Sequence, residues 1–426
     1  MINTFTSFFK SKEIRKKIFF TLGMLLVYML GKAIIVPGVD TTVLHASLSS
    51  NSLVGMMNLL GGGALTTFSI FSMGVGPYIT ASIIIQLLSM DVIPYLTDLA
   101  KEGQSGRQKM DRITRYLGVV LCFVQAFSMT YAFDKAYGLV TSPSIFTYFY
   151  VATILSAGTM FLLWIGDQIT LHGVGNGVSM IIFAGIVSTL PFSFVSMYQQ
   201  MATGGASALI QFWLYIVLYL VIIIIVIVMQ LAVRKIPIQY SAGTGHRGGK
   251  DDMNHLPLKI NSASVIPVIF AQSIITAPQI LATFLSNNAF LTKLGQWLSP
   301  TQPVGLIIYT ILIVLFTFFY TELQVDPEKI SENLQKSNAY IPLVRPGADT
   351  KRYISTVLNR ITVLGMLALV LVAVLPYLLP MITDLPSASM MSIGGTGVII
   401  AVGVAMETVS QLKGQLTQKS YKGFFK

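Results

Sequence analysis

Residues 10–37 read KSKEIRKKIFFTLGMLLVYMLGKAIIVP, a basic segment followed at once by a long apolar run. The arrangement recurs, because nearly all of the 28 lysines and arginines fall in alternate gaps between apolar stretches. The exceptions are Lys32, Lys135 and Lys293. Cytoplasmic loops of membrane proteins carry such an excess of basic residues. The pattern therefore predicts a polytopic membrane protein with both termini in the cytoplasm and an even number of crossings.

The composition agrees with this prediction. Mean hydropathy is +0.71, with 54% apolar and 11% charged residues, which excludes a soluble globular domain and a disordered chain. Membrane topology and attraction to anionic lipid explain the net charge of +11. The single cysteine, Cys122, excludes an intramolecular disulfide. No small-x-small cleavage site follows the first apolar run, so we interpret it as an uncleaved span.

Ten stretches are long enough to cross about 30 Å of hydrocarbon. They lie near residues 18–37, 69–90, 114–133, 147–166, 177–194, 207–233, 261–284, 304–322, 355–380 and 391–412. A Gly-rich cytoplasmic turn, 167–176, joins the fourth to the fifth, and longer cytoplasmic loops cover about 231–260 and 323–354. The predicted fold is all-α, with two five-helix halves, 1–195 and 196–426. An odd number of spans in each half makes the second half an inverted repeat of the first.

One apolar segment is too short to be a span. Residues 53–65, LVGMMNLLGGGAL, are broken by three consecutive glycines. If this segment crossed the membrane, every later loop would change sides and the charge pattern would be lost. We expect it to enter from the outer face and return, which requires that protein bury it or that it line a watery cavity. The alternative is an interfacial helix on the outer surface.

Catalytic and metal-binding patterns are not found in the sequence. None of the four histidines has metal-ligand spacing, and no nucleophile or phosphate-loop motif occurs. We therefore expect a protein that is not an enzyme and uses no cofactor or metal. Ion-coupled transporters carry charged residues within their spans, whereas the 17 acidic residues here lie at span ends or in loops. A secondary solute transporter with inverted repeats remains the alternative to a channel.

Several motifs closely resemble those of the SecY family, the channel subunits of the protein translocase. They include PYITASIIIQLL (77–88), WIGDQIT (164–170), GNGVSMIIFAGIV (175–187), HLPLKIN (255–261), VIPVIF (265–270) and RPG (345–347). The resemblance implies a channel in the bacterial plasma membrane that passes unfolded preproteins outward and releases hydrophobic segments sideways into the lipid. It also implies SecE and SecG as further subunits, and SecA or a ribosome docked on the basic loops.

The resemblance also implies four sets of functional residues. The pore ring comprises Ile79, Ile83, Val178, Ile182, Ile269 and Ile400, with Ile399 as the alternative to Ile400. The plug lies in about 55–72 and includes Met56, Met57, Asn58, Leu59, Leu60, Gly61, Gly62 and Gly63. The lateral gate, between the second and seventh spans, contains Gln86, Ser89, Gln272 and Ser273. The cytoplasmic docking residues are Arg345, Arg234 and Lys235.

Spacing and chemistry fit the ring. Ile79 and Ile83 are four residues apart, as are Val178 and Ile182, so each pair shares one helix face. Branched aliphatic side chains bind no ion tightly and can seal a pore by excluding water, whereas ion filters use carbonyl or charged rings. By spacing alone, such isoleucines are also typical of packed core.

Overall fold

The computed structural model is mainly helical. It describes residues 11–40, 64–65, 67–90, 92–202, 206–240, 255–284, 293, 295, 297–300, 302–382 and 395–422. A helix lies in each of the ten ranges predicted as spans. These helices are α2 (Lys12–Lys32), α5 (Gly76–Leu88), α7 (Gln104–Tyr137), α8 (Ile145–His172), α9 (Gly177–Ala202), α10 (Ala206–Leu231), α11 (Ile266–Phe284), α13 (Pro303–Gln324), α15 (Ala348–Ile382) and α17 (Gly395–Lys422).

Length and composition separate the helices into two kinds. Within the described residues, four segments are long and apolar enough to cross a membrane: Gln104–Lys135, Ile145–His172, Pro303–Lys336 and Ala348–Leu378. Shorter apolar helices include α5, whose 13 residues rise only about 20 Å. The predicted range 69–90 was too long because the chain before Gly76 forms turns.

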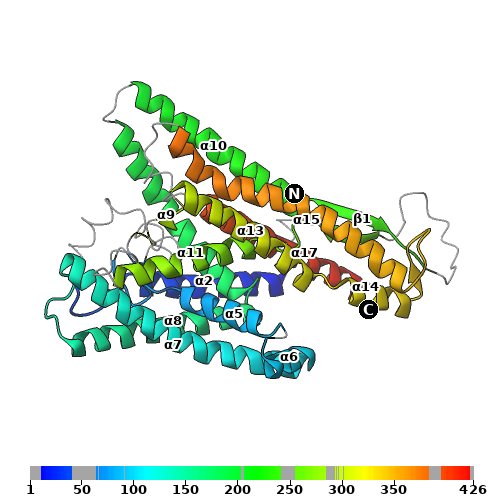
Figure 1. Ribbon diagram of the computed structural model, residues 1–426, viewed down its shortest axis with the longest axis horizontal. Coiled ribbons are helices and arrows are strands. Elements are labelled where there is room, and N and C mark those ends of the chain that lie inside the picture. Colours follow the sequence, from blue (N-terminus) through cyan, green and yellow to red (C-terminus); the bar gives the residue numbers. More distant parts are fainter. Residues whose placement is uncertain are drawn as a thin grey trace.

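The helices form two groups that meet at two seams (Figure 1). In the first group α7 packs against both α5 and α8, and in the second α13 packs against both α11 and α15. At one seam α9 contacts α10 and α17. At the other, α11 contacts α5 and α7. The second and seventh predicted spans, α5 and α11, are therefore neighbours across a boundary between the groups.

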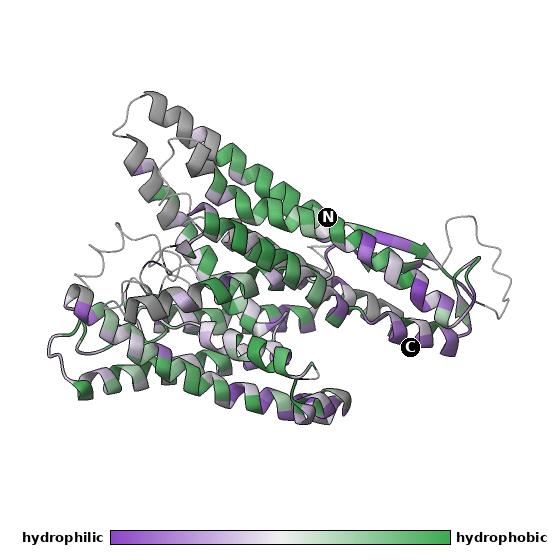
Figure 2. Cartoon of the chain, viewed as in Figure 1, coloured by the Kyte–Doolittle hydropathy of each residue, from purple (hydrophilic) through white to green (hydrophobic). Residues whose placement is uncertain are grey.

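The polar loops gather at one end of the molecule. Figure 1 shows α6 (Pro94–Lys101), β1 (Val233–Pro237) and α14 (Pro327–Lys336) at the same end. Figure 2 shows hydrophilic residues concentrated there, whereas the bodies of the helices are mainly hydrophobic. This distribution agrees with the charge pattern of the sequence, in which alternate loops share one side of the membrane.

Short strands join two loops that are distant in the sequence. β1 pairs in antiparallel fashion with β3 (His255–Lys259), and β2 (Gln239–Tyr240) pairs with β4 (Ala339–Tyr340). The first pair closes the loop between α10 and α11, and the second ties that loop to the one between α13 and α15. The two long polar loops are therefore one structural unit.

The predicted plug falls mostly outside the described residues. Met56, Met57, Asn58, Leu59, Leu60, Gly61, Gly62 and Gly63 all lie there, so the structure does not test them. The described end of the range 55–72 forms turns. Phe71 is buried there, with its ring stacked between those of Tyr28 and Phe161. This packing fixes the chain immediately before α5.

The turn between α8 and α9 is shorter than predicted. Asp167 was placed in a turn from 167 to 176, but α8 continues to His172. The Asp167 carboxylate forms an ion pair with Arg115 of α7 at 2.8 Å, which ties α8 to the adjacent helix. A Cβ on Gly177 would meet the carbonyl oxygen of Gly166, so the absence of a side chain lets the start of α9 approach α8.

Candidate functional site

The six residues predicted as a pore ring come from α5, α9, α11 and α17. All six belong to one large cluster of contacting apolar side chains. Ile83, Ile182 and Ile400 are buried, and the other three are partly buried against the cluster. Both a closed constriction and an ordinary core would have this packing. The packing therefore does not test the predicted ring. A cavity beside the cluster is lined by three of the six residues but not by Ile79, Ile83 or Val178.

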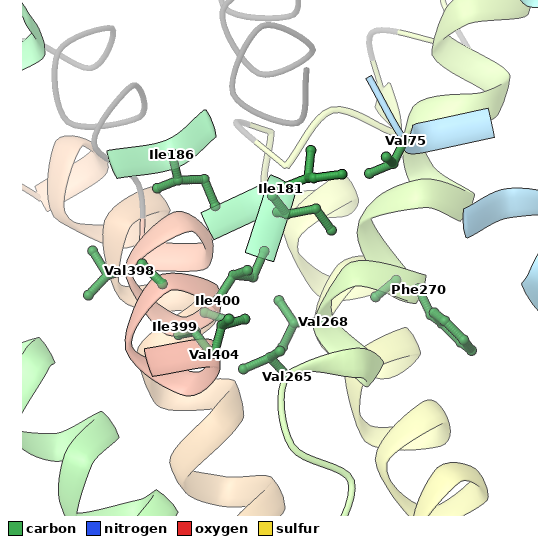
Figure 3. Close-up of a cluster of buried hydrophobic side chains, with 14 of the residues drawn as sticks. Val75, Ile181, Ile186, Val265, Val268, Phe270, Val398, Ile399, Ile400 and Val404 are labelled. Atoms are coloured by element: carbon green, nitrogen blue, oxygen red, sulfur yellow. The ribbon is translucent and has the colours of Figure 1, made fainter. Parts of the chain in front are cut away.

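A cavity of about 310 Å³ lies between α9, α11 and α17. Ile182, Ile269 and Ile400, one from each helix, line it. Figure 3 shows Ile400 and its neighbours on α17 beside Val265 and Val268 at the start of α11. Ile399 is fully buried but is not among the lining residues. The tertiary structure thus brings three ring candidates from distant parts of the chain to one cavity wall.

The rest of the cavity wall mixes apolar with polar side chains, and two of the polar ones, Lys259 and Glu407, are charged. Gln230 and Asn261 line it, and the buried Gln230 Nε2 and Asn261 Oδ1 atoms have no hydrogen-bond partner among the described residues. Asn261 Nδ2 donates to the carbonyl oxygen of Ser264 at 3.0 Å. Buried polar atoms without a partner are uncommon. These two can bind water or the backbone of a polypeptide in the cavity.

The predicted gate residues lie on the two helices that meet at the second seam, except Ser89, which directly follows the last residue of α5. Gln272 is buried, and Gln86 is half-buried with no hydrogen-bond partner for its Oε1 among the described residues. The Ser89 hydroxyl donates to the carbonyl oxygen of Gln86 at 2.7 Å, and that of Ser273 to Ile269 at 2.9 Å. Each serine hydroxyl thus donates within its own chain segment rather than across the seam. Neither serine therefore holds α5 and α11 together by a hydrogen bond that would have to break when the two helices separate.

The predicted docking residues belong to the unit formed by the two polar loops. Arg234 and Lys235 lie on β1, opposite Leu258 and Pro257 of β3, and both are exposed. Arg345 lies in the loop between β4 and α15 and is also exposed. The two loops share a buried apolar cluster that comprises Ile236, Leu258, Ile341, Ile354, Leu358 and Ile361. The structure therefore places all three basic residues on one packed platform.

Among the described residues, ion pairs occupy Lys329 and Lys351 of the platform but not Arg345 or Lys235. Lys329 pairs with Asp326 at 3.3 Å, and Lys351 with Glu328 at 2.8 Å. The hydrogen bond that Lys351 donates to Glu328, together with the negative charge of Glu328, raises the pKa of Lys351. Arg345 forms no ion pair with a described residue. Its guanidinium is available to a partner, whereas the two lysines are already neutralised locally.

Asp326 fixes the start of α14. Its side chain accepts hydrogen bonds from the backbone N–H groups of Glu328 and Lys329 at 3.0 and 3.3 Å, as an N-cap residue does. Burial raises the pKa of the Asp326 carboxyl, but hydrogen bonds from Lys329 and Glu328 outweigh it and hold the pKa below its ordinary value. The charged carboxylate therefore stabilises the platform.

Sequence reasoning missed the strands that join the loops. The alternation of Ile236, Ile238 and Tyr240 is a strand signal that the sequence does carry. Ile236 and Ile238 are indeed buried. Pro257 obscured the partner strand, because proline cannot donate to a ladder of hydrogen bonds.

Comparisons with known proteins agree on one family. A model of the SecY family matches residues 69–409. The chain is 45% identical over its whole length to the protein translocase subunit SecY of Staphylococcus carnosus, covering 99% of that protein. It is 47% identical, again over its whole length, to the protein translocase subunit SecY of Bacillus licheniformis, covering 100% of that protein.

Solved structures share the fold. A structure described as that of a protein-conducting channel matches with a TM-score of 0.69 and 18% identity, covering 93% of this chain and 91% of that one. A structure of canine Sec61 in a ribosome–channel complex matches with a TM-score of 0.66, over the same shares of the two chains. At 18% identity, these likenesses concern the fold alone.

Proposed function

Because this chain belongs to the SecY family, we infer that it is the pore-forming subunit of a protein translocation channel. It passes unfolded preproteins across a membrane and releases hydrophobic segments sideways into the lipid. The relatives described above are translocase subunits, so the solute-transporter alternative gains no support. As a channel subunit, the chain conducts a polypeptide rather than converting it chemically.

The cavity between α9, α11 and α17 is the observation that carries the proposal. Its wall is mixed, with aliphatic side chains, the uncharged amides of Gln230 and Asn261, and two charged residues, Lys259 and Glu407. A polypeptide of arbitrary sequence passes most easily along the part of the wall that carries no charge, to which Ile182, Ile269 and Ile400 contribute. Branched aliphatic residues can close around such a chain and exclude water without binding it. We assign the ring to Ile79, Ile83, Val178, Ile182, Ile269 and Ile400.

The architecture that we propose has ten spans in two inverted halves, 1–195 and 196–426. The seam between α5 and α11 is its lateral gate, with Gln86, Ser89, Gln272 and Ser273 along it. Residues 55–72 form the plug on the outer side. The contact of α5 with α11, and the intrahelical hydrogen bonds of the two serines, support the gate.

The proposed membrane is the bacterial plasma membrane, with both termini in the cytoplasm. SecE and SecG complete the channel, and SecA or a translating ribosome docks on the platform that carries Arg345, Arg234 and Lys235. The exposure of these residues, and the fact that Arg345 forms no ion pair with a described residue, support the docking role. A guanidinium forms forked hydrogen bonds to carboxylate or phosphate, which an ammonium cannot imitate.

Charge reversal at Arg345 tests the proposal. Arg345→Glu should abolish export of a preprotein into vesicles that contain SecA and ATP, while yield, membrane insertion and SecE association stay normal. Arg345→Lys should be impaired as well. Lys351→Glu is the matched control, because it reverses an exposed charge near Arg345 that is already paired with Glu328. Export at the wild-type rate by Arg345→Glu would refute the docking role, and ion-driven uptake of a solute would favour a transporter.

A further inference from the structure

Leu343 is the most exposed large apolar residue of the described chain. Its relative exposure is 107%, so it makes almost no contact with the rest of the protein. Its neighbours behave differently, since Ile341 is buried and Val344 packs against the same apolar cluster. Arg345, two residues further on, is exposed like Leu343. The loop thus alternates between residues that anchor it and residues that it presents to the outside.

The backbone at Leu343 is unusual for a leucine. The N–H of Val344 donates to the carbonyl oxygen of Ile341 at 3.1 Å, which closes a turn with Pro342 second and Leu343 third. Leu343 has φ +67°, in the left-handed region. Proline in the second place and positive φ in the third are typical of a type II turn, which favours glycine or asparagine there. A leucine is strained at this position, and contacts of its exposed side chain with the described residues do not offset that strain.

The turn is firmly held in place. The Thr350 hydroxyl donates to the carbonyl oxygen of Arg345 at 2.8 Å, and that of Ser331 to the carbonyl oxygen of Gly347 at 2.9 Å. Ile341 and Val344 fix the other side through the apolar cluster. Leu343 and Arg345 are therefore presented together on a rigid support, which lowers the entropy that binding must overcome.

The chemistry of this pair favours a protein partner over RNA. Protein contacts to RNA rely on charge, on stacking with aromatic or arginine planes and on hydrogen bonds, and leucine offers none of these. An apolar side chain beside an arginine that forms no ion pair with a described residue instead fits an apolar pocket with carboxylates at its rim. We propose that Leu343 inserts into such a pocket on the motor protein SecA, and that Arg345 pairs with the carboxylates. The inference rests on the proposed function, in which Arg345 docks a partner.

The test compares stability with affinity in the complete channel complex in vesicles. Leu343→Gly and Leu343→Asn relieve the backbone strain but remove the apolar side chain, whereas Leu343→Met keeps it apolar. We expect the first two to weaken binding of SecA about ten-fold, as loss of a buried leucine contact does. Their melting temperatures should equal or exceed that of the wild type. Leu343→Met should bind SecA within about two-fold of the wild type, and binding of ribosomes should be unchanged in all three.

Each contrary result overturns a defined part of the inference. Wild-type affinity for SecA in Leu343→Gly would show that the side chain is not a contact. Lower melting temperature and lower affinity together would show a purely structural role. Loss of ribosome binding with normal SecA binding would show that the partner is wrong. Arg345→Glu, measured in parallel, tests the proposed function separately, because its effect does not depend on whether Leu343 is a contact.

Discussion

Ile399 and Ile400 are a matched pair for testing whether the cavity between α9, α11 and α17 is part of the translocation path. They are adjacent residues of the same type on α17, and their side chains are 0% and 3% exposed. Only Ile400 lines the cavity. We therefore compare Ile399→Ala with Ile400→Ala, which remove the same atoms from equally buried positions on different faces of the helix.

The two substitutions should differ in their cost to stability. Each removes three buried carbons, worth about 2.4 kcal/mol at about 0.8 kcal/mol per carbon. In a membrane the unfolded helices remain in lipid, so loss of packing contacts accounts for most of the effect. Ile399 has neighbours on all sides, whereas Ile400 already borders empty space. We expect a cost of about 2 kcal/mol for Ile399→Ala and about 1 kcal/mol for Ile400→Ala, measured by thermal unfolding of the purified complex.

Ion conductance should change in the opposite order. Ile400→Ala widens the aliphatic part of the cavity wall and should raise resting conductance in planar bilayers that contain the purified channel. Ile399→Ala should leave conductance near the wild-type value despite its larger cost in stability. If Ile399→Ala leaks as much as Ile400→Ala, or if neither leaks, Ile400 is core rather than ring and the reasoning is wrong.

Three further predictions concern the plug, the gate and the platform. Deletion of residues 56–65 should raise resting conductance while the protein still inserts, and unchanged conductance would argue against a plug. In a chain with Cys122→Ala, cysteines replacing Ser89 and Ser273 should crosslink on oxidation and block export until they are reduced; failure to crosslink in any state would refute the gate assignment. Asp326→Ala should cost α14 about 1 kcal/mol, seen as faster proteolysis of the loop. The wild type should lose the same stability at low pH. Folding lowers the pKa of Asp326 below its ordinary value of 3.8, so its carboxylate stabilises α14 fully above pH 3.8 and stops doing so as the pH falls through the lowered pKa. A rate of proteolysis that is independent of pH would contradict this.

The sequence by itself determined the class of protein and the positions of its helices. Long apolar runs between basic segments predict spanning helices, because backbone N–H and C=O groups inside the bilayer must be paired within the protein and a helix pairs them within one continuous run. For this reason a helix lies in each of the ten predicted ranges. Helix ends were less predictable. Asp167 lies inside α8 and forms an ion pair with Arg115, and periodicity reveals neither.

Only the tertiary structure decided which residues face the cavity and which platform presents Arg345. Ile399 and Ile400 are equivalent in the sequence, and the contact of α17 with α9 turns only one of them toward the empty space. Likewise, pairing of β2 with β4 joins two loops about 100 residues apart, through backbone hydrogen bonds that no local pattern encodes. Local sequence sets the conformation of each segment, but contacts between distant segments depend on how their surfaces fit. The third position of this turn favours glycine, but the residue there is Leu343. The strain follows from its positive φ angle, which the sequence alone does not give.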